Sequence, residues 1–146
     1  MSHITVLCTR RHLPGSALIR VWHRAAVSHV ALIDPEREEV IEAVWPRVRV
    51  TPLAEARAKA SYAVERRIAL PHPERAIAFA RSQIGKRYDW KATIGVGVRY
   101  DMHDAERWNC VELIAAAVAA GGRQLFHDER HHRLWPGLIH LANFES

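Results

Sequence analysis

The pattern of apolar and polar positions in the first third of the chain predicts an antiparallel sheet. Residues 28–33 form a short apolar run, residues 39–45 form a second, and the Asp-Pro-Glu-Arg turn between them is typical of a β-hairpin. Residues 47–50 alternate strictly between arginine and valine, which indicates a third consecutive strand. A further strand is expected at residues 3–8, where the residues are β-branched and loosely alternating.

Later segments carry helical signals. Pro73 lies where proline is favoured at the first position of a helix, so residues 73–84 predict an amphipathic helix that ends at Gly85. Asn109, a good N-cap residue, precedes an almost pure Ala, Leu, Ile and Val segment that ends at Gly121-Gly122. Because this segment is apolar nearly all round, it predicts a helix buried in the core. Weaker patterns favour a helix at 16–26, a helix or helical loop at 52–63, a strand at 62–70 and a long loop after residue 85.

The composition places the chain among ordinary soluble domains. It has 146 residues, of which 49% are hydrophobic and 25% are charged, and we expect one α+β domain over residues 1–146. No stretch approaches the roughly 20 apolar residues that a bilayer span requires. The N-terminus has no basic region before its short apolar run, which argues against a signal peptide. The expectation is a protein without a transmembrane segment, synthesised in the cytoplasm.

The charge and the cysteine content narrow the partners. The net charge is +5 and the sequence pI is near 9.8, mostly because of arginine, which favours anionic partners such as phosphate, carboxylate or envelope polymers. The sequence has no basic helix, aromatic RNA-binding strand or zinc-finger spacing, so no nucleic-acid partner is expected. Cys8 and Cys110 are the two cysteines, and without an export signal we expect reduced thiols.

Cys110 is the candidate nucleophile. Asn109 places its sulfur at the start of the apolar helix, where the free N–H groups and the positive end of the helix dipole favour a thiolate and can bind a developing oxyanion. A nucleophilic cysteine also needs a base, and His29 lies at the start of an apolar strand, where an imidazole is unusual. Taken singly, however, such a cysteine is more often a small buried hydrophobe, and such a histidine is more often structural.

Hairpin geometry offers a third member. If the turn pairs Ile33 with Val40, Glu42 lies diagonally across from His29 on the same face of the sheet, where its carboxylate could orient the imidazole. A shift of one residue in the register would move Glu42 to the opposite face. Asp34 and Glu39 lie nearer the turn and are less favoured, and Glu42 alone would be taken for a solvated strand residue.

Two other motifs are weaker. His127 and His131 are four residues apart, but a zinc-protease helix needs glutamate directly after the first histidine, and Asp128 occupies that position. The surrounding segment is charged throughout, which is typical of a solvated surface, so no metal site is predicted. The Gly-Val-Gly run at 95–97 is too short for a dinucleotide fingerprint.

Four segments in order resemble a known family. They are Ser-His-Val-Ala-Leu-Ile at 28–33, Ile-Glu-Ala at 41–43, Gly-Lys-Arg-Tyr-Asp-Trp at 85–90 and Trp-Asn-Cys-Val-Glu-Leu at 108–113. Together they resemble the circularly permuted branch of the NlpC/P60 papain-like superfamily, which includes the YiiX-like and lecithin retinol acyltransferase-like groups. In that branch the histidine strand precedes the cysteine helix, as it does here.

The resemblance implies a fold and a set of site residues. The fold would be a permuted papain-like arrangement, with a small antiparallel sheet packed on the buried helix that carries the cysteine. Cys110 would be the nucleophile, His29 the general base and Glu42 the residue that orients it. Tyr88 and Trp108 would line the substrate site.

This chain departs from the family pattern at three positions. Val111 stands where the family usually has serine, Leu113 where classical members have glycine, and Ala31 where permuted members often have glycine. Small residues near the nucleophile leave room for substrate, so these changes affect the expected shape of the pocket more than its chemistry.

The resemblance also implies an activity. It points to a cysteine peptidase or amidase that cleaves an amide bond through a thioester, without a metal or organic cofactor, with bacterial cell-wall peptide as the preferred substrate. The segments at 4–10 and 13–16 resemble short proteins of phage tail and lysis modules, so phage tail proteins are possible partners and delivery to the wall in a virion or through a holin is possible. Two alternatives stay open: a lipid-directed acyltransferase or amidase with the same three residues, and a non-catalytic tail-assembly or wall-binding module.

Overall fold

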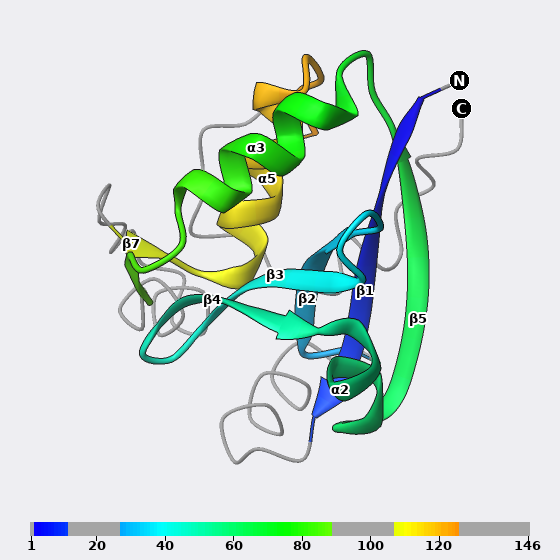
Figure 1. The fold of residues 1–146 in the computed structure, drawn as a ribbon, viewed down its shortest axis with the longest axis vertical. Coiled ribbons are helices and arrows are strands. Elements are labelled where there is room, and N and C mark those ends of the chain that lie inside the picture. The colour runs from blue at the N-terminus through cyan, green and yellow to red at the C-terminus, as the bar shows by residue number, and fades with distance from the viewer. Residues whose placement is uncertain (1, 12–26, 89–106, 126–146) are drawn as a thin grey trace.

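A seven-stranded sheet forms the centre of the protein (Figure 1). The computed structural model describes residues 2–11, 27–88 and 107–125. The strands are β1 (His3–Arg11), β2 (His29–Asp34), β3 (Glu39–Val44), β4 (Arg47–Pro52), β5 (Ala60–Ala69), β6 (Arg87–Tyr88) and β7 (Arg107–Trp108). Their order across the sheet is β5-β1-β2-β3-β4-β6-β7, and every neighbouring pair is antiparallel except β6 and β7.

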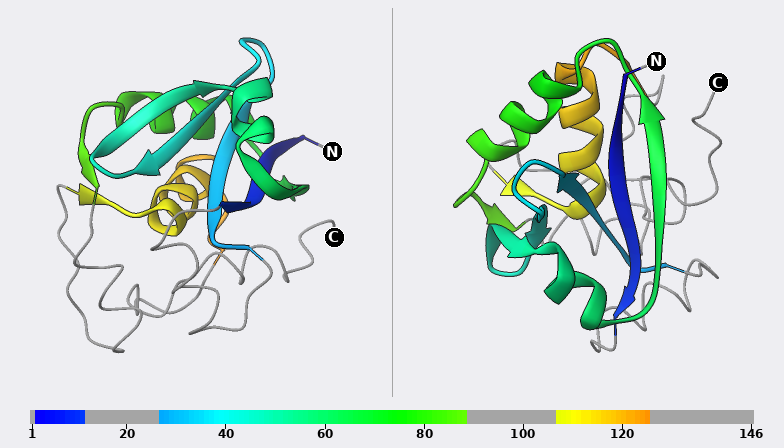
Figure 2. Two further views of the ribbon diagram at one scale, coloured as in Figure 1. Left: turned by 90° about the horizontal axis from the view of Figure 1, so that it is seen from below. Right: turned by 45° about the vertical axis from the view of Figure 1, so that its right-hand side comes forward.

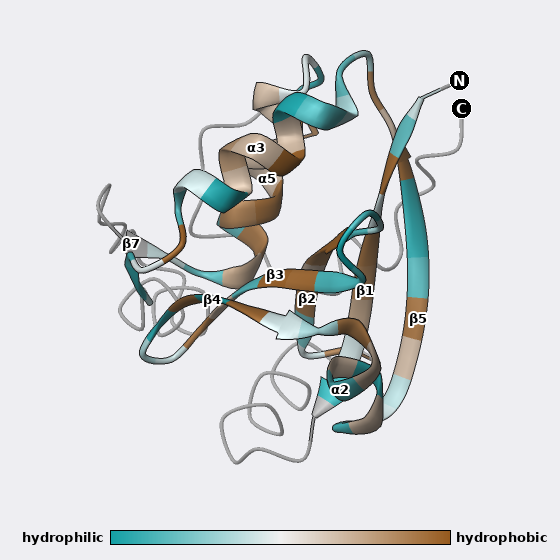
Figure 3. Cartoon of the chain, viewed as in Figure 1, coloured by the Kyte–Doolittle hydropathy of each residue, from teal (hydrophilic) through white to brown (hydrophobic). Residues whose placement is uncertain are grey.

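Helices cover both faces of this sheet (Figures 1 and 2). They are α2 (Leu53–Ala58), α3 (Pro73–Ser82) and α5 (Cys110–Ala120). Helices α3 and α5 pack on one face and form the larger apolar cluster with side chains that include Val6, Val30 and Ile41. Helix α2 packs on the other face, where a smaller cluster includes Leu7 and Ala31. Figure 3 shows the contrast between α5, whose residues are mostly hydrophobic, and α3, whose residues are mixed.

The alternation of side chains along β2 and β3 explains how the two faces are built. Successive residues of a strand point to opposite faces, so Val30 and Ile41 contact the α3–α5 layer while Ala31 and Val40 contact the α2 layer. All six residues of β2 are buried, since the strand lies between helical layers.

The predicted elements are largely present. The α+β class, the hairpin, the strand that follows it and both main helices are confirmed, and α5 begins at Cys110 and ends before Gly121-Gly122 as expected. The uncertain segment from 52 to 70 divides into α2 and the long strand β5, which pairs with β1 and enlarges the sheet. Strands β6 and β7 occupy positions that the sequence assigned to a loop, because two-residue strands leave no periodic pattern.

Several expectations lie outside the described residues. They are the helix at 16–26, most of the loop after residue 88, and the histidine-rich stretch around His127 and His131. Within the described ranges, no helix has the length and apolar character needed to cross a membrane.

An ion cluster fastens the hairpin to α3. Arg81, in the last turn of α3, donates to Asp34 Oδ2 through Nε at 2.8 Å and Nη2 at 2.6 Å, and its Nη2 also lies 2.8 Å from Glu39 Oε2. These contacts join the helix to the two ends of the β2–β3 turn. They also give Asp34 and Glu39 a structural role, which agrees with their lower rank as partners for His29.

Removal of this cation tests its contribution to stability. We expect Arg81→Ala to lower the free energy of unfolding by about 2–4 kcal/mol, since it leaves two neighbouring carboxylates without a cation. Urea denaturation followed by circular dichroism measures the change. Arg75→Ala, on the exposed part of the same helix, is the matched control and should change stability by less than about 0.5 kcal/mol. Equal effects of the two substitutions would contradict the role of the cluster.

Candidate active site

The cysteine helix starts with a complete capping box. Asn109 is the N-cap, and its side-chain oxygen accepts hydrogen bonds from the backbone N–H groups of Val111 at 3.0 Å and Glu112 at 2.9 Å. In return, Glu112 Oε2 accepts a bond of 3.2 Å from the Asn109 N–H. Cys110 is therefore the first residue of α5, as the sequence predicts, and the cap fixes its position relative to the sheet.

The thiol of Cys110 is buried, and this changes its expected chemistry. The residue is 7% exposed and packs in the larger apolar cluster. Burial raises the pKa of the thiol to about 11, although the N–H groups of Val30, Val111 and Cys110 itself act to lower it. The expectation that the helix start favours a thiolate is therefore wrong for the resting protein, because desolvation outweighs the helix N–H groups.

The cap also limits which donors can face an oxyanion. Asn109 already binds the N–H groups of Val111 and Glu112. The Cys110 N–H is the helix-start donor that the cap does not use. The sequence predicted that several N–H groups at the helix start bind an oxyanion, and in the structure the cap leaves the Cys110 N–H for this role.

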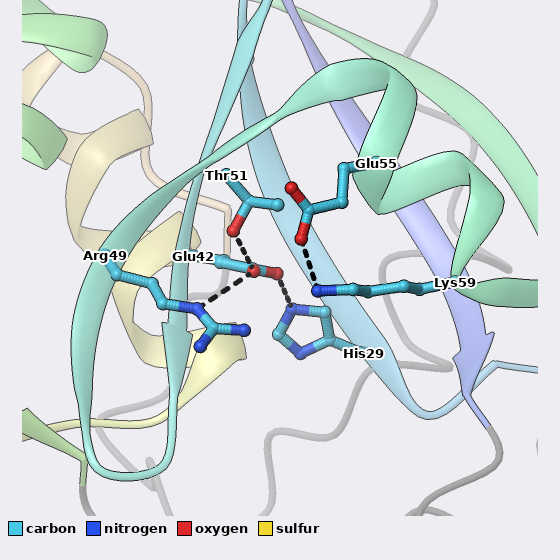
Figure 4. A network of polar contacts seen from close by, with 6 residues as sticks. All are labelled: His29, Glu42, Arg49, Thr51, Glu55 and Lys59. Carbon is cyan, nitrogen blue, oxygen red and sulfur yellow. Dashed lines mark hydrogen bonds and ion pairs between the residues drawn. The ribbon is translucent and has the colours of Figure 1, made fainter.

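His29 and Glu42 form a buried pair. Strand β2 pairs with β3 in the predicted register, with Ile33 opposite Val40, and this brings His29 Nε2 to 2.8 Å from Glu42 Oε2 (Figure 4). Glu42 is 0% exposed and His29 is also buried, so the carboxylate depends on protein partners for its hydrogen bonds. The bond also leaves Nδ1 as the imidazole nitrogen directed away from Glu42.

Strand β4 supplies two further partners of Glu42 that the sequence analysis missed. Thr51 Oγ1 donates a hydrogen bond of 2.8 Å to Glu42 Oε1, and Arg49 Nε lies 3.5 Å from the same oxygen (Figure 4). Arg49 is the direct cross-strand partner of Glu42. The strict alternation of residues 47–50 already indicated a strand here. Pairing of this strand with β3 places residues 49 and 51 on the face of the sheet that carries Glu42.

Two of the three sequence-predicted residues are bonded to each other, and the third contacts the backbone of the same strand. His29 is the first residue of that strand, Glu42 is bonded to it, and the Cys110 thiol faces the N–H of Val30, the next residue along the chain. Helix α5 contacts both β2 and β3. Strand alternation places His29 and Glu42 on the α2 side of the sheet with Ala31 and Val40, whereas Cys110 packs in the larger cluster on the α5 side. Direct approach of the imidazole to the thiol stays a prediction.

Tyr88 and Trp108 are neighbours in the sheet. They are register partners in the parallel β6–β7 pair, and both pack partly buried against the larger apolar cluster. Trp108 Nε1 donates a hydrogen bond of 3.0 Å to Gln83 Oε1, and its ring meets Phe79 edge to face at 6.1 Å between centroids. These contacts hold Trp108 against α3. A role of either residue in lining a substrate site stays a prediction.

Known proteins resemble this chain in structure more than in sequence. No family model matches the sequence, and no curated protein matches it. Among solved structures, the metalloprotein YiiX from Escherichia coli O157:H7 matches with a TM-score of 0.68 and 19% sequence identity, over 85% of this chain and 68% of that chain. The chain has the YiiX fold.

The likeness to YiiX confirms the α+β, YiiX-like fold, and the circular permutation of the motifs stays a prediction. A mixed α+β structure with a YiiX-like arrangement was expected from four short segments, and the match spans most of the chain. At this level of identity, the YiiX match establishes the fold. The chemistry must be argued from the residues of this chain.

Proposed function

We propose that this protein is a cysteine hydrolase of the NlpC/P60 type that cleaves an amide bond through a thioester on Cys110. The observation that carries the proposal is the buried His29–Glu42 pair at the start of β2, beside the peptide that faces the Cys110 thiol. A buried imidazole bonded to a buried carboxylate is the arrangement that orients a general base.

The proposed reaction uses His29 as an acid and a base in turn. His29 Nδ1 takes the proton from the Cys110 thiol as the sulfur attacks the carbonyl carbon, and the carbonyl electrons move to oxygen, which the Cys110 N–H stabilises. Collapse breaks the carbon–nitrogen bond, and His29 returns the proton to the leaving amine. A water molecule, deprotonated by His29, then attacks the thioester carbon; the carbon–sulfur bond breaks and the thiol is restored.

The raised pKa of Cys110 bears on how this reaction begins. With a thiol pKa of about 11 in the resting protein, a standing thiolate–imidazolium pair is disfavoured at neutral pH. The proton would therefore leave the sulfur during attack, which makes His29 a general base in the strict sense.

An anionic substrate, with bacterial cell-wall peptide as the first choice, suits the basic surface that β4 and β6 form. Arg47 of β4 is the register partner of Arg87, which in turn is the register partner of Arg107. The Arg47 and Arg87 side chains are exposed, and within the described part of the chain neither forms an ion pair. Two like charges on neighbouring strands favour a bound anion, such as a peptide carboxylate. Trp45, 74% exposed on the turn before Arg47, adds an apolar ring to the same region.

The YiiX neighbour is described as a metalloprotein, so the fit of a metal to this chain matters. Among the described residues, no group of three or more histidine, cysteine, aspartate or glutamate side chains gathers as ligands would. Both oxygens of Glu42 accept hydrogen bonds or ion pairs from protein groups. The described residues therefore do not fit a metal site, and the proposed steps use none.

A non-catalytic role is the second candidate, favoured by the burial of the thiol. Cys110 is almost inaccessible, and Val111 and Leu113, which replace small family residues, are buried in the apolar cluster around it. In this alternative the domain would be a wall-binding or tail-assembly module. It predicts that Cys110 has no reactivity that depends on His29.

The decisive experiment is the pH dependence of Cys110 alkylation by iodoacetamide, followed by mass spectrometry in a Cys8→Ala background. We expect the rate to rise with an apparent pKa below the ordinary thiol value of about 8.5, because neutral His29 removes the proton while the sulfur attacks the reagent. In His29→Ala the rate should rise only toward pH 11. His72→Ala, which removes an exposed histidine at the start of α3, is the matched control and should behave like the parent protein.

Two outcomes separate the candidates. Profiles that coincide with and without His29 would remove the main support for a hydrolase and favour the binding module. A His29-dependent profile justifies a substrate screen of purified peptidoglycan and of acyl lipids with Cys110→Ala as the blank. Release of muropeptides supports the wall substrate, whereas release of fatty acyl groups alone would replace it with a lipid substrate.

A further inference from the structure

The Glu42 carboxylate is held at both oxygens. Oε2 faces His29 Nε2 at 2.8 Å, and Oε1 accepts the Thr51 hydroxyl at 2.8 Å (Figure 4). An ionised carboxylate can only accept hydrogen bonds, so the Thr51 hydroxyl must be the donor. Since Thr51 is buried on the neighbouring strand, its hydroxyl fixes the rotation of the carboxylate as well as its charge.

Arg49 adds a positive charge on the same oxygen. Its Nε lies 3.5 Å from Glu42 Oε1, and its side chain is 49% exposed, so the cation keeps contact with water while it faces a buried anion. The other charged groups drawn nearby are Glu55 of α2 and Lys59, which directly follows α2, and they pair with each other (Figure 4). On β1, the register partner of His29 is the neutral Thr9.

We propose that Thr51 and Arg49 are positioning residues that keep Glu42 ionised and aimed at His29. This inference rests on the proposed function, in which His29 is the base, and it extends the site from three residues to five on four different elements. Strand β4 thereby becomes part of the site, although neither of its residues touches the reacting atoms.

The proposal predicts the direction of a titration. His29 and Glu42 share one strong contact and titrate as a pair. A hydroxyl donor and a cation at Oε1 stabilise the state in which the pair has lost its proton and carries a net negative charge. Loss of either group destabilises that deprotonated state, so the apparent pKa of the pair rises. As the pH falls, His29 then becomes protonated at a higher pH than in the parent protein.

The test is an NMR titration of the His29 ring in a Cys110→Ala background. We expect Thr51→Val, which keeps the shape but removes the hydroxyl, to raise the apparent pKa by about one unit, and Arg49→Met to raise it by a similar amount. Thr51→Ser restores the donor and should return the value to that of the parent. Arg47→Met, on the same face of β4 but two residues from Arg49, is the matched charge control and should shift it by less than about 0.3 units.

The outcomes are distinct from those of the alkylation experiment. An unshifted titration in folded Thr51→Val and in Arg49→Met would overturn the inference, even if Cys110 alkylation depends on His29. A shifted titration together with alkylation that ignores His29 would sustain the positioning role and overturn the hydrolase. If Thr51→Val does not fold, the half-exposed Arg49 decides the matter: no shift in Arg49→Met overturns the proposal, and a shift of the expected sign supports it.

Discussion

The free energy of unfolding is expected to fall steeply above pH 9, because two buried thiols resist ionisation. Burial raises the pKa of Cys8 from 9.0 to about 12, and the neighbouring Arg66 only partly offsets it; burial raises that of Cys110 to about 11. The folded protein therefore keeps protons that the unfolded chain loses. This stability is fully present below pH 9 and is lost as the pH rises through the folded values, at roughly 1.4 kcal/mol per pH unit for each thiol.

Urea denaturation at a series of pH values between 7 and 11.5, with reductant present, measures this loss. Other groups titrate in the same range, so the informative quantity is the difference between the parent and Cys8→Ala. By pH 11 the parent should have lost about 3 kcal/mol more than the variant, which has one thiol fewer. Parallel curves for the two proteins would show that Cys8 ionises as easily in the folded state as in the unfolded chain.

Truncation of Glu42 is expected to have an effect of similar size at neutral pH. Glu42→Ala should lower the free energy of unfolding by about 3–5 kcal/mol, because it opens a cavity and leaves the buried His29 Nε2 and Thr51 hydroxyl without their shared acceptor. Urea denaturation at pH 7 measures this change. Glu36→Ala, in the exposed hairpin turn, is the matched control and should change stability by less than about 0.5 kcal/mol.

A second variant separates the lost polar contacts from the lost volume. Glu42→Gln keeps the size of the side chain, and its single carbonyl oxygen can still accept from either Thr51 or His29, so it should recover about half of the stability lost in Glu42→Ala. A cost below about 1 kcal/mol for Glu42→Ala would show that water or a rearranged partner replaces the carboxylate. Such a result would also weaken the assignment of Glu42 as the residue that orients His29.

The sequence was most informative where a local signal determines the geometry. A four-residue turn between two apolar runs suggested the Ile33–Val40 register on which the His29–Glu42 contact depends, and the structure has that register. Asn109 followed by an apolar segment specified the start of α5, since capping depends on the nearest three residues. Each of these features depends on neighbours in the chain, and a pattern of residues encodes such features directly.

Features that depend on distant segments were not predicted. The pKa of Cys110 depends on how deeply other elements bury the thiol, and a favourable helix start says nothing about that. The role of Thr51 required the pairing of a third strand, and the pairing of β5 with β1 joins segments about 60 residues apart. The parallel β6–β7 pair brings together two dipeptides too short to show a period.

The burial of Glu42 also bears on how the chain chooses among alternative strand alignments. A slip of β3 by one residue would exchange the two faces of the strand and move the carboxylate from beside His29 into the apolar layer beneath α5, among side chains such as Val30 and Leu32. An unpaired charge there is far more costly than a misplaced alanine or valine. Glu42 thus raises the free energy of misaligned hairpins relative to the native register. Glu42→Leu would remove this difference and make misaligned intermediates more populated during folding, even if its native contacts were well packed.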